Sequence, residues 1–354
     1  MQHPPMIDGW IDRPHLRHDL GDFPLESGEV IRDAFVSYVI HGDPARLCRD
    51  AILVTTAIGS THHRLDFMIG DGEPLDTSRW CVIVVDALGN GLSVSPSNSA
   101  QQSNDAFPRF SIRDMVESQR RLLDHLGVES LVAVVGASMG GMQAIQWAVS
   151  YPLYMRALVA MVPMARTASW CRLVNEMSRR ALFTDTEFRR PRPRDEAMAL
   201  WVPLTQGVMA RTPLAIEHIE GADVPAWLAQ RERFLTQYGP DPFDWCYQTW
   251  AYDDHDVGGT PGCEGDTRLA LTRVRAATLV VAPELDLYNP PHAAKEMADE
   301  IPRAQFVELS GNEGHACAAG HPCQATTQLR HAVGDFLRNI GPTAKKTHRV
   351  NGGS

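Results

Sequence analysis

Ser138 is the centre of the pentapeptide GASMG (residues 136–140), which fits the G-x-S-x-G pattern of a serine nucleophile. An apolar run rich in β-branched residues precedes it at residues 131–135, and a segment with a helical pattern follows at residues 141–149. So short a turn between a buried strand and a helix holds the serine in a strained conformation, with its Oγ exposed above the sheet. The backbone N–H of Met139 then points to where an oxyanion would form.

A serine nucleophile needs a base to take its proton and a carboxylate to orient that base. The apolar run at residues 278–282 leads into a loop with Asp286, and the run at residues 305–309 leads into a loop with His315. In α/β-hydrolases the three groups follow in the order Ser, Asp or Glu, His, each in a loop after a strand. We therefore predict Asp286 as the orienting carboxylate and His315 as the base.

Nearby residues offer alternatives and one further role. Glu284 competes for the carboxylate position and His321 for the base. His62 and His63 follow the first buried run, but no third ligand stands at a metal-binding spacing, so they are interpreted as surface histidines and no metal is predicted. The second oxyanion N–H is expected from Ile58, in the loop after that run.

The elements that must position these residues form a regular series. Short apolar runs alternate with helical patterns, one of which begins after Ser111 as its N-cap. The runs occupy residues 51–57, 80–85, 131–135, 157–162, 278–282 and 305–309. This series predicts a mostly parallel central sheet with helices on both faces. The serine turn after one of its strands and the order Ser138, Asp286, His315 are those of an α/β-hydrolase fold, which is the fold class we expect. An edge strand is predicted at residues 36–40, and the polar residues 1–30 are interpreted as an arm.

Over a hundred residues between positions 162 and 278 lack a convincing buried strand. They hold five of the eight tryptophans and helical stretches at residues 173–182 and 226–237, which predicts a helical cap over the nucleophile. The predicted organisation is a first part of the core with its N-terminal arm, a cap, a second part of the core and a flexible tail. These cover residues 1–165, 166–270, 271–340 and 341–354.

Composition excludes several classes of function. The net charge of −10 over 354 residues argues against nucleic-acid and anionic-membrane surfaces, and no apolar run reaches membrane-spanning length. Seven cysteines, an odd number without paired close spacing, indicate reduced thiols, and no signal-peptide pattern opens the sequence. We therefore expect a cytoplasmic protein.

Four long segments of the chain resemble the homoserine O-acetyltransferase family of α/β-hydrolases. They are DALGNGLSVSPSNS, FPRFSIRDMVESQRRLLDHLG, VVGASMGGMQAIQWAVSYP and VNEMSRRALFTDTEF. The resemblance implies a ping-pong reaction, in which the serine takes an acetyl group from acetyl-CoA and passes it to a hydroxyl. It also implies a homodimer that forms through the caps.

The resemblance also implies roles for single residues. Ser138, Asp286 and His315 take the places of the family's catalytic triad, and Ile58 and Met139 those of its oxyanion N–H donors. Arg179 matches a cap arginine that faces the substrate's carboxylate in the transferases.

Departures from the family pattern bear on the acceptor. RRPRPRDEA follows Phe188 where the family has a Gly-Tyr-rich stretch, and Thr56 replaces a typical histidine. The catalytic histidine of the transferases is usually followed by an aspartate that can face the amino group of homoserine. Here Ala316 and Cys317 follow, so homoserine should bind poorly, because an unpaired buried ammonium is costly. The carboxylates that could substitute are Asp253 and Asp256.

The favoured reading is a serine esterase that hydrolyses small esters, acetates above all, without a cofactor. The alternative is a homoserine O-acetyltransferase with acetyl-CoA as acyl donor. A non-catalytic binding module is the third reading, and the intact set of Ser, Asp and His argues against it.

Overall fold

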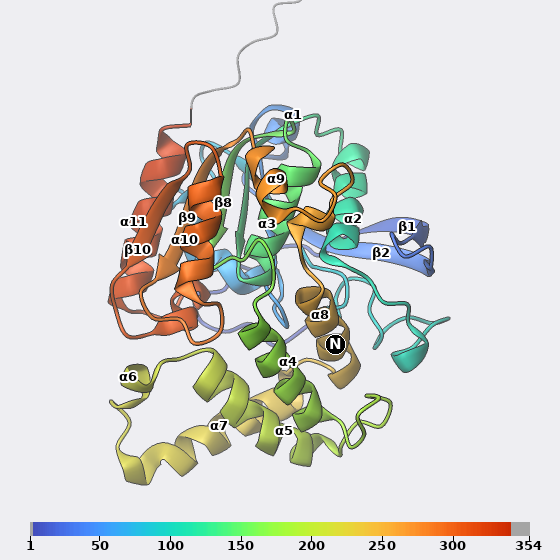
Figure 1. Cartoon of the computed structure of the whole chain (residues 1–354), viewed down its shortest axis with the longest axis vertical. Coiled ribbons are helices and arrows are strands. Elements are labelled where there is room, and N and C mark those ends of the chain that lie inside the picture. Colours follow the sequence, from blue (N-terminus) through green and yellow to red (C-terminus); the bar gives the residue numbers. More distant parts are fainter. Residues whose placement is uncertain (1–2, 341–354) are drawn as a thin grey trace, which may run out of the picture.

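The computed structural model describes residues 3–340, so the predicted tail at residues 341–354 lies outside the described part. An eight-stranded sheet in the order β1-β2-β6-β3-β7-β8-β9-β10 forms its centre (Figure 1). The strands are β1 (Leu16–Pro24), β2 (Val30–His41), β3 (Ala51–Thr55), β6 (Cys81–Val85), β7 (Leu131–Ala137), β8 (Met155–Met161), β9 (Ala277–Pro283) and β10 (Gln305–Leu309). A separate pair joins β4 (Ile69–Gly70) to β5 (Leu75–Asp76).

Six neighbouring strands of the sheet pair in parallel, in the order β6, β3, β7, β8, β9 and β10. Strand β2 pairs antiparallel with β6. Strands β3, β6 and β7 are buried along their whole length, which explains their almost continuous apolar sequences. The predicted α/β-hydrolase fold with a mostly parallel sheet is therefore confirmed.

The interpretation of residues 1–30 as a polar arm is wrong for β1, which pairs antiparallel with β2. Its sequence LRHDLGDFP shows no clear alternation, because an edge strand leaves most side chains exposed and irregularities interrupt its register on both sides of Gly21. Strand β2 is longer than the predicted residues 36–40, and the prediction of an edge strand there is wrong, because β2 pairs with β1 on one side and with β6 on the other.

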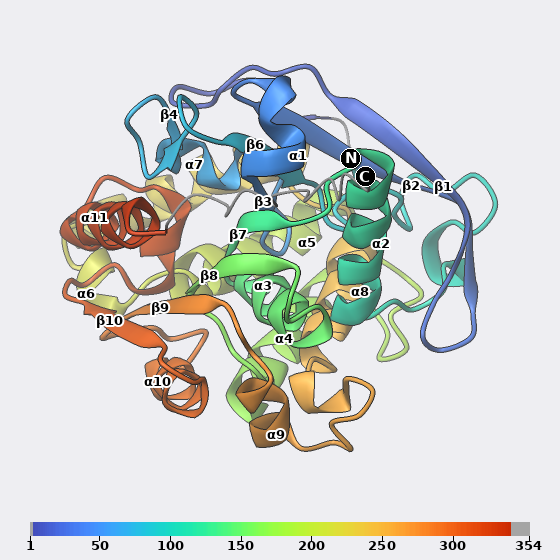
Figure 2. The same ribbon diagram turned by 90° about the horizontal axis from the view of Figure 1, so that it is seen from above.

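Helices cover both faces of the sheet, as Figure 2 shows from above. Helices α2 (Ile112–His125), α3 (Met139–Ser150) and α10 (Pro291–Glu300) pack on one face, and α11 (Gln324–Arg338) packs on the other. The short α1 (Leu47–Asp50) precedes β3. As predicted, Ser111 caps α2: its Oγ accepts from the backbone N–H of Asp114 in a complete capping box.

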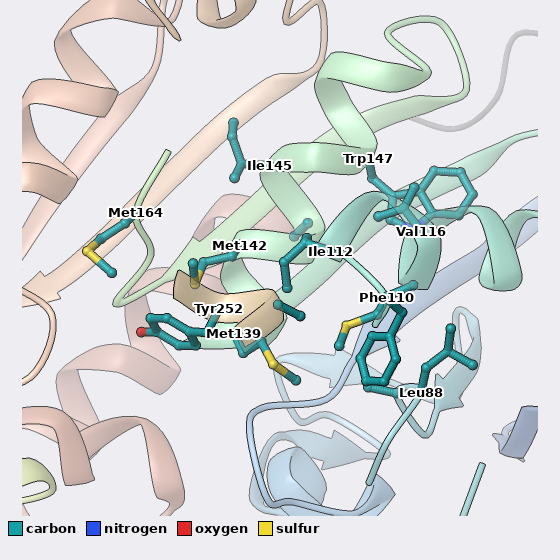
Figure 3. Close-up of a cluster of buried hydrophobic side chains, with 14 of the residues drawn as sticks. Leu88, Phe110, Ile112, Val116, Met139, Met142, Ile145, Trp147, Met164 and Tyr252 are labelled. Atoms are coloured by element: carbon teal, nitrogen blue, oxygen red, sulfur yellow. The ribbon is translucent and has the colours of Figure 1, made fainter. Parts of the chain in front are cut away.

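Helix α3 is fixed in the apolar core shown in Figure 3. Met142 and Trp147 of α3 lie toward Ile112 and Val116 of α2, and Ile145 belongs to the same buried cluster. The indole N–H of Trp147 donates to Oε1 of Gln119 at 2.7 Å, so this buried polar group is satisfied. A helix anchored in this way holds the residue at its N-terminus, Ser138, in a defined position.

Between β8 and β9 the chain forms helices. They are α4 (Ser169–Leu182), α5 (Arg194–Val202), α6 (Pro213–Ile216), α7 (Val224–Tyr238), α8 (Pro242–Asp253) and α9 (Thr267–Thr272). The predicted helical stretches at residues 173–182 and 226–237 lie within α4 and α7. Helices α4 to α7 gather beyond one edge of the sheet, below it in Figure 1, whereas α9 lies beside the sheet. The predicted domain boundaries remain a prediction.

The base of this excursion is closed by backbone hydrogen bonds. The N–H of Thr167 donates to the carbonyl of His255 at 3.0 Å, and the N–H of Val257 donates to that of Ala165 at 2.9 Å. We call residues 168–254 the helical insertion and this antiparallel pair of short segments its neck.

We expect Gly140→Ala to destabilise the fold by about 3 kcal/mol. A Cβ on Gly140 would lie 2.3 Å from the carbonyl oxygen of Thr55, and a backbone carbonyl cannot swing aside. Urea unfolding measures the loss. Gly207→Ala is the control, because nothing lies within 4 Å of its added Cβ; it should shift stability by no more than about 1 kcal/mol. Equal stability of the two variants would contradict the close approach of β3 and α3.

We expect His255 to make the protein less stable in acid. The side chain is buried in the neck, where burial, followed by the charge of Arg113, lowers its pKa from 6.5 to about 4. The unfolded chain therefore takes up the proton first. The neutral His255 side chain therefore contributes about 3 kcal/mol to the free energy of unfolding above about pH 6.5, and this contribution is lost as the pH falls toward 4.

Urea unfolding of wild-type and His255→Asn protein between pH 4 and 7 tests this prediction. The free energy of unfolding should depend less steeply on pH in the variant. The same substitution at the exposed His331 should leave the slope unchanged. Parallel profiles for wild type and His255→Asn would contradict the prediction.

Candidate active site

Ser138 lies between the end of β7 and the start of α3, with φ of 57° and ψ of −124°. A non-glycine residue rarely adopts this conformation, so the strain predicted from the GASMG sequence is confirmed. The Ser138 side chain is only 1% exposed, however. The expectation of an exposed Oγ is wrong in this respect: the hydroxyl stands at the edge of the sheet but is covered by the chain around it.

The structure brings Ser138, His315 and Asp286 into one hydrogen-bonded chain. Nε2 of His315 lies 2.9 Å from Oγ of Ser138, and Nδ1 of His315 lies 2.8 Å from Oδ2 of Asp286. Both Asp286 and His315 are 7% exposed. When the imidazole is neutral and donates its Nδ1–H to Asp286, its Nε2 can accept the serine proton.

Backbone and side-chain contacts fix Asp286 in this chain. Its Oδ1 accepts the N–H groups of Tyr288 and Asn289 at 2.8 and 2.9 Å. The Nδ2–H of Asn289 donates in turn to the carbonyl of Val162 at 2.7 Å, just after β8. One carboxylate oxygen is thereby held by the loop, and the other is directed at the histidine.

The two alternatives for these positions lie elsewhere. Glu284 is exposed, and its Oε1 lies 3.4 Å from the N–H of Gly311. His321 lines a cavity of about 370 Å³ together with Arg211 and Arg231. Neither residue takes part in the hydrogen-bonded chain to Ser138.

The two predicted oxyanion donors lie on elements that pack together. Met139 is the first residue of α3, where the N–H has no intrahelical acceptor. The loop with Ile58 follows β3, and Oγ1–H of Thr55, at the end of β3, donates to the carbonyl of Gly140 at 2.7 Å. Gln248 of α8 braces this loop, because its Oε1 accepts the N–H of Gly59 at 2.9 Å. The segments that carry the two predicted donors thus pack against each other, and the oxyanion role of Ile58 and Met139 remains a prediction.

Arg179 is buried on α4 and forms ion pairs within the protein. Its Nη1 lies 2.8 Å from Oδ2 of Asp253, and its Nη2 lies 3.0 Å from Oε2 of Glu176. Burial raises the pKa of Asp253 even though Arg179 opposes this shift. Two acids of the helical insertion thus neutralise the arginine that was predicted to bind a substrate carboxylate.

The carboxylates considered as substitutes for the missing aspartate are already engaged. Besides Arg179, Asp253 accepts a hydrogen bond from Nδ2 of Asn175 at 2.7 Å. Oδ1 of Asp256 accepts from the N–H of Gly258 and from Oγ1 of Thr267, both at 2.7 Å. Ala316 and Cys317, which follow the histidine, are buried.

Two tyrosines beside the hydrogen-bonded chain were not predicted. The hydroxyl of Tyr252 donates to Oδ1 of Asn289 and interacts with Ser138, and that of Tyr288 donates to Oδ1 of Asn175 at 2.6 Å. Burial raises the pKa of both phenols well above 10, so both stay protonated as donors. The position of Tyr288 two residues after Asp286 was an available signal, whereas nothing in the local sequence distinguishes Tyr252.

The interpretation of His62 and His63 as surface residues is wrong. Their exposed fractions are 1% and 4%, and each Nδ1 lies against a buried carboxylate, that of Asp86 or of Asp66. The spacing in the sequence did not reveal His3, whose Nε2 lies 3.0 Å from Nε2 of His63 although the two residues are 60 positions apart.

A profile of the α/β-hydrolase fold matches residues 64–318. The chain belongs to the α/β-hydrolase family. Over residues 3–340, no helix combines the length and apolar character needed to cross a membrane.

This α/β-hydrolase is similar to proteins of two named activities. It is 29% identical to an ethyl acetate hydrolase of Pseudomonas veronii, over 90% of this chain and 94% of that protein. It is 31% identical to a homoserine O-acetyltransferase of Geobacter sulfurreducens, over 79% of this chain and 84% of that one. The structure of the acetyl esterase MekB matches with a TM-score of 0.84 and 28% identity, over 92% of this chain and 97% of that one. The resemblance to the homoserine O-acetyltransferase family is confirmed.

Proposed function

We propose that this α/β-hydrolase is a serine-dependent carboxylic-ester hydrolase that acts on small acyl esters, acetates above all. The observation that carries the proposal is the buried hydrogen-bonded chain from Ser138 through His315 to Asp286. A serine beside a neutral imidazole whose other nitrogen donates to a carboxylate is equipped for acyl transfer.

In the proposed reaction, Oγ of Ser138 attacks the ester carbonyl while Nε2 of His315 takes the serine proton. Asp286 stabilises the imidazolium, and the N–H groups of Ile58 and Met139 stabilise the oxyanion. The imidazolium returns its proton to the departing alcohol, which leaves an acyl-serine. A water that gives its proton to His315 then attacks the acyl carbon, and the acid leaves as Ser138 regains its proton. No cofactor is needed.

The surroundings of the nucleophile favour a small acyl group. Ser138 and Met139 are almost completely buried, and Tyr252, whose hydroxyl interacts with Ser138, is fully buried. Space beside the serine for a long acyl chain would require these side chains to move. An acetyl group, which is small, requires little movement of these side chains.

The ion pairs of Arg179 favour water over homoserine as acceptor. An amino-acid acceptor needs an available cation for its carboxylate and an acceptor for its ammonium. Arg179 is neutralised by Asp253 and Glu176, and Ala316 and Cys317 carry no carboxylate. Hydrolysis by water requires neither a free cation nor an acceptor for an ammonium group.

The second candidate is a homoserine O-acetyltransferase with acetyl-CoA as donor. Its support is the Geobacter sulfurreducens relative together with the retained arginine at position 179. Both candidates share one acyl-enzyme and differ in the nucleophile that reaches it. Homodimer formation through the helical insertion and a cytoplasmic location belong to the proposal for either candidate.

The fate of an acetyl group decides between the two. Purified protein is incubated with ethyl acetate or p-nitrophenyl acetate, and separately with acetyl-CoA and homoserine. Acetate from the esters without O-acetylhomoserine is the expected result. Robust O-acetylhomoserine formation without ester hydrolysis would overturn the hydrolase and support the transferase, and inactivity in both assays would contradict the proposed chemistry altogether.

A further inference from the structure

Three histidine side chains from two distant parts of the chain meet, and none of them belongs to the hydrogen-bonded chain of Ser138. His3 belongs to the N-terminal arm, and His62 and His63 begin the 3₁₀ segment His62–Met68. One ring nitrogen from each lies within 4.8 Å of the other two, and Nε2 of His3 lies 3.0 Å from Nε2 of His63. We call these three residues the histidine cluster.

Buried carboxylates orient two of the rings. Nδ1 of His62 lies 3.0 Å from Oδ2 of Asp86, and Nδ1 of His63 lies 2.6 Å from Oδ2 of Asp66. A carboxylate that accepts the Nδ1–H fixes the ring orientation and the tautomer, and it leaves the Nε2 lone pair available to a metal. This arrangement is typical of metal-binding histidines.

One ring nitrogen of the cluster has an unmet requirement. Within residues 3–340, Nε2 of His62 is buried without a hydrogen-bond partner, and the side chain is 1% exposed. A buried polar atom without a partner costs free energy, so such atoms are rare and call for an explanation. A cation bound at this nitrogen would supply the missing interaction.

The buried carboxylates next to the histidine cluster also favour a bound cation. Asp86 is fully buried and Asp66 is 4% exposed. Within the described residues, the ion pairs recorded for these two carboxylates are with His62 and His63. A divalent cation held by the rings would lie close to both of these buried carboxylates, which is a favourable place for a positive charge.

We propose that His3, His62 and His63 bind one Zn²⁺ ion through their Nε2 atoms. Tetrahedral zinc with Zn–N bonds of about 2.05 Å separates its nitrogens by roughly 3.3 Å, close to the spacing of His3 and His63. The exposed ring of His15 lies beside the cluster, with its centroid 4.6 Å from that of His3 and 4.5 Å from that of His62, but it does not belong to the group whose ligand atoms converge. Water would take the fourth position.

The ion has a structural role in this proposal. The arm already contacts the 3₁₀ segment: Trp10 stacks on His63 with 4.2 Å between ring centroids, and the N–H of Ile11 donates to Asp66 at 2.8 Å. Zinc would fasten the arm to a segment that begins four residues after Ile58. The cluster would thereby restrain the loop that carries a proposed oxyanion donor.

The metal content of protein prepared without a polyhistidine tag, in zinc-containing medium, tests the proposal. Wild-type protein should carry about one zinc per chain by mass spectrometry. Removal of zinc with a chelator should lower Tm by roughly 5 °C, and added Zn²⁺ should restore it. Co²⁺ in its place should give the visible absorption of a tetrahedral nitrogen site.

His3→Gln is the decisive variant, because His3 is only partly buried on the arm and its replacement spares the buried Asp86 network. It should weaken zinc binding at least tenfold and remove the response of Tm to the chelator. His18→Gln is the matched control, since His18 stacks on His125 in another histidine pair, with ring centroids 4.1 Å apart. Zinc far below one per chain with no response of Tm would overturn the proposal, as would zinc retained at full affinity by His3→Gln.

Discussion

Replacement of Ser138 with alanine is expected to lower kcat for acetate-ester hydrolysis about a millionfold. The substitution removes the hydroxyl that lies 2.9 Å from Nε2 of His315, so the proposed acyl-enzyme can no longer form. The remaining N–H donors and binding contacts should still give a rate about a thousandfold above that of the uncatalysed reaction in water. Alanine keeps the side-chain volume and the strained backbone, so Tm should change little.

The measurement is p-nitrophenyl acetate hydrolysis together with thermal unfolding of the same preparation. His321→Gln is the matched control, because it changes the other histidine of the same loop region without touching Ser138. It should retain kcat within about a factor of three, as expected for a group outside the reacting set. Retention of most of the activity by folded Ser138→Ala would rule out Ser138 as nucleophile.

Asp286→Asn is expected to lower kcat about ten-thousandfold through the tautomer of His315. The N–H groups of Tyr288 and Asn289 both need an acceptor, so they should hold the amide oxygen of the new side chain. The amide NH₂ would then face Nδ1 of His315, which must accept in place of donating. The imidazole proton would move to Nε2, which could no longer take the proton of Ser138.

Steady-state kinetics of Asp286→Asn against Glu284→Gln measures this effect. Glu284 is exposed two residues earlier on the same loop, so its amide variant should change kcat less than about threefold. KM should change little in Asp286→Asn, because the lost interaction stabilises the transition state and does not contact the bound substrate. Similar kcat losses in the two variants would contradict the orienting role of Asp286.

The sequence predicted the parts of the candidate site that depend on local pattern. GASMG between a buried run and a helix specifies the turn at Ser138, and the loops after two further runs bring Asp286 and His315 to the same sheet edge. Parallel strands make this inference possible, because their carboxyl ends meet at one edge.

What escaped prediction depends on contacts between distant segments. Asp253 lies 74 residues from Arg179, and His3 lies 60 residues from His63, so no local spacing could reveal either contact. The burial of Ser138 depends on how the surrounding chain packs over it. The polar strand β1 escaped because edge strands need no buried alternation.

The neck of the helical insertion has a consequence for how this chain can change. Hydrogen bonds between Thr167 and His255 and between Val257 and Ala165 bring the two ends of the insertion together. A replacement segment of another length or sequence could therefore be grafted between them without a change in the spacing of β8 and β9. Arg179 and Asp253 lie inside the insertion, whereas Ser138, Asp286 and His315 lie outside it. A graft that keeps Gln248 and Tyr252, which contact the Ile58 loop and the Ser138 region, would therefore change the surroundings of Arg179 while the hydrogen bonds among Ser138, His315 and Asp286 stay in place.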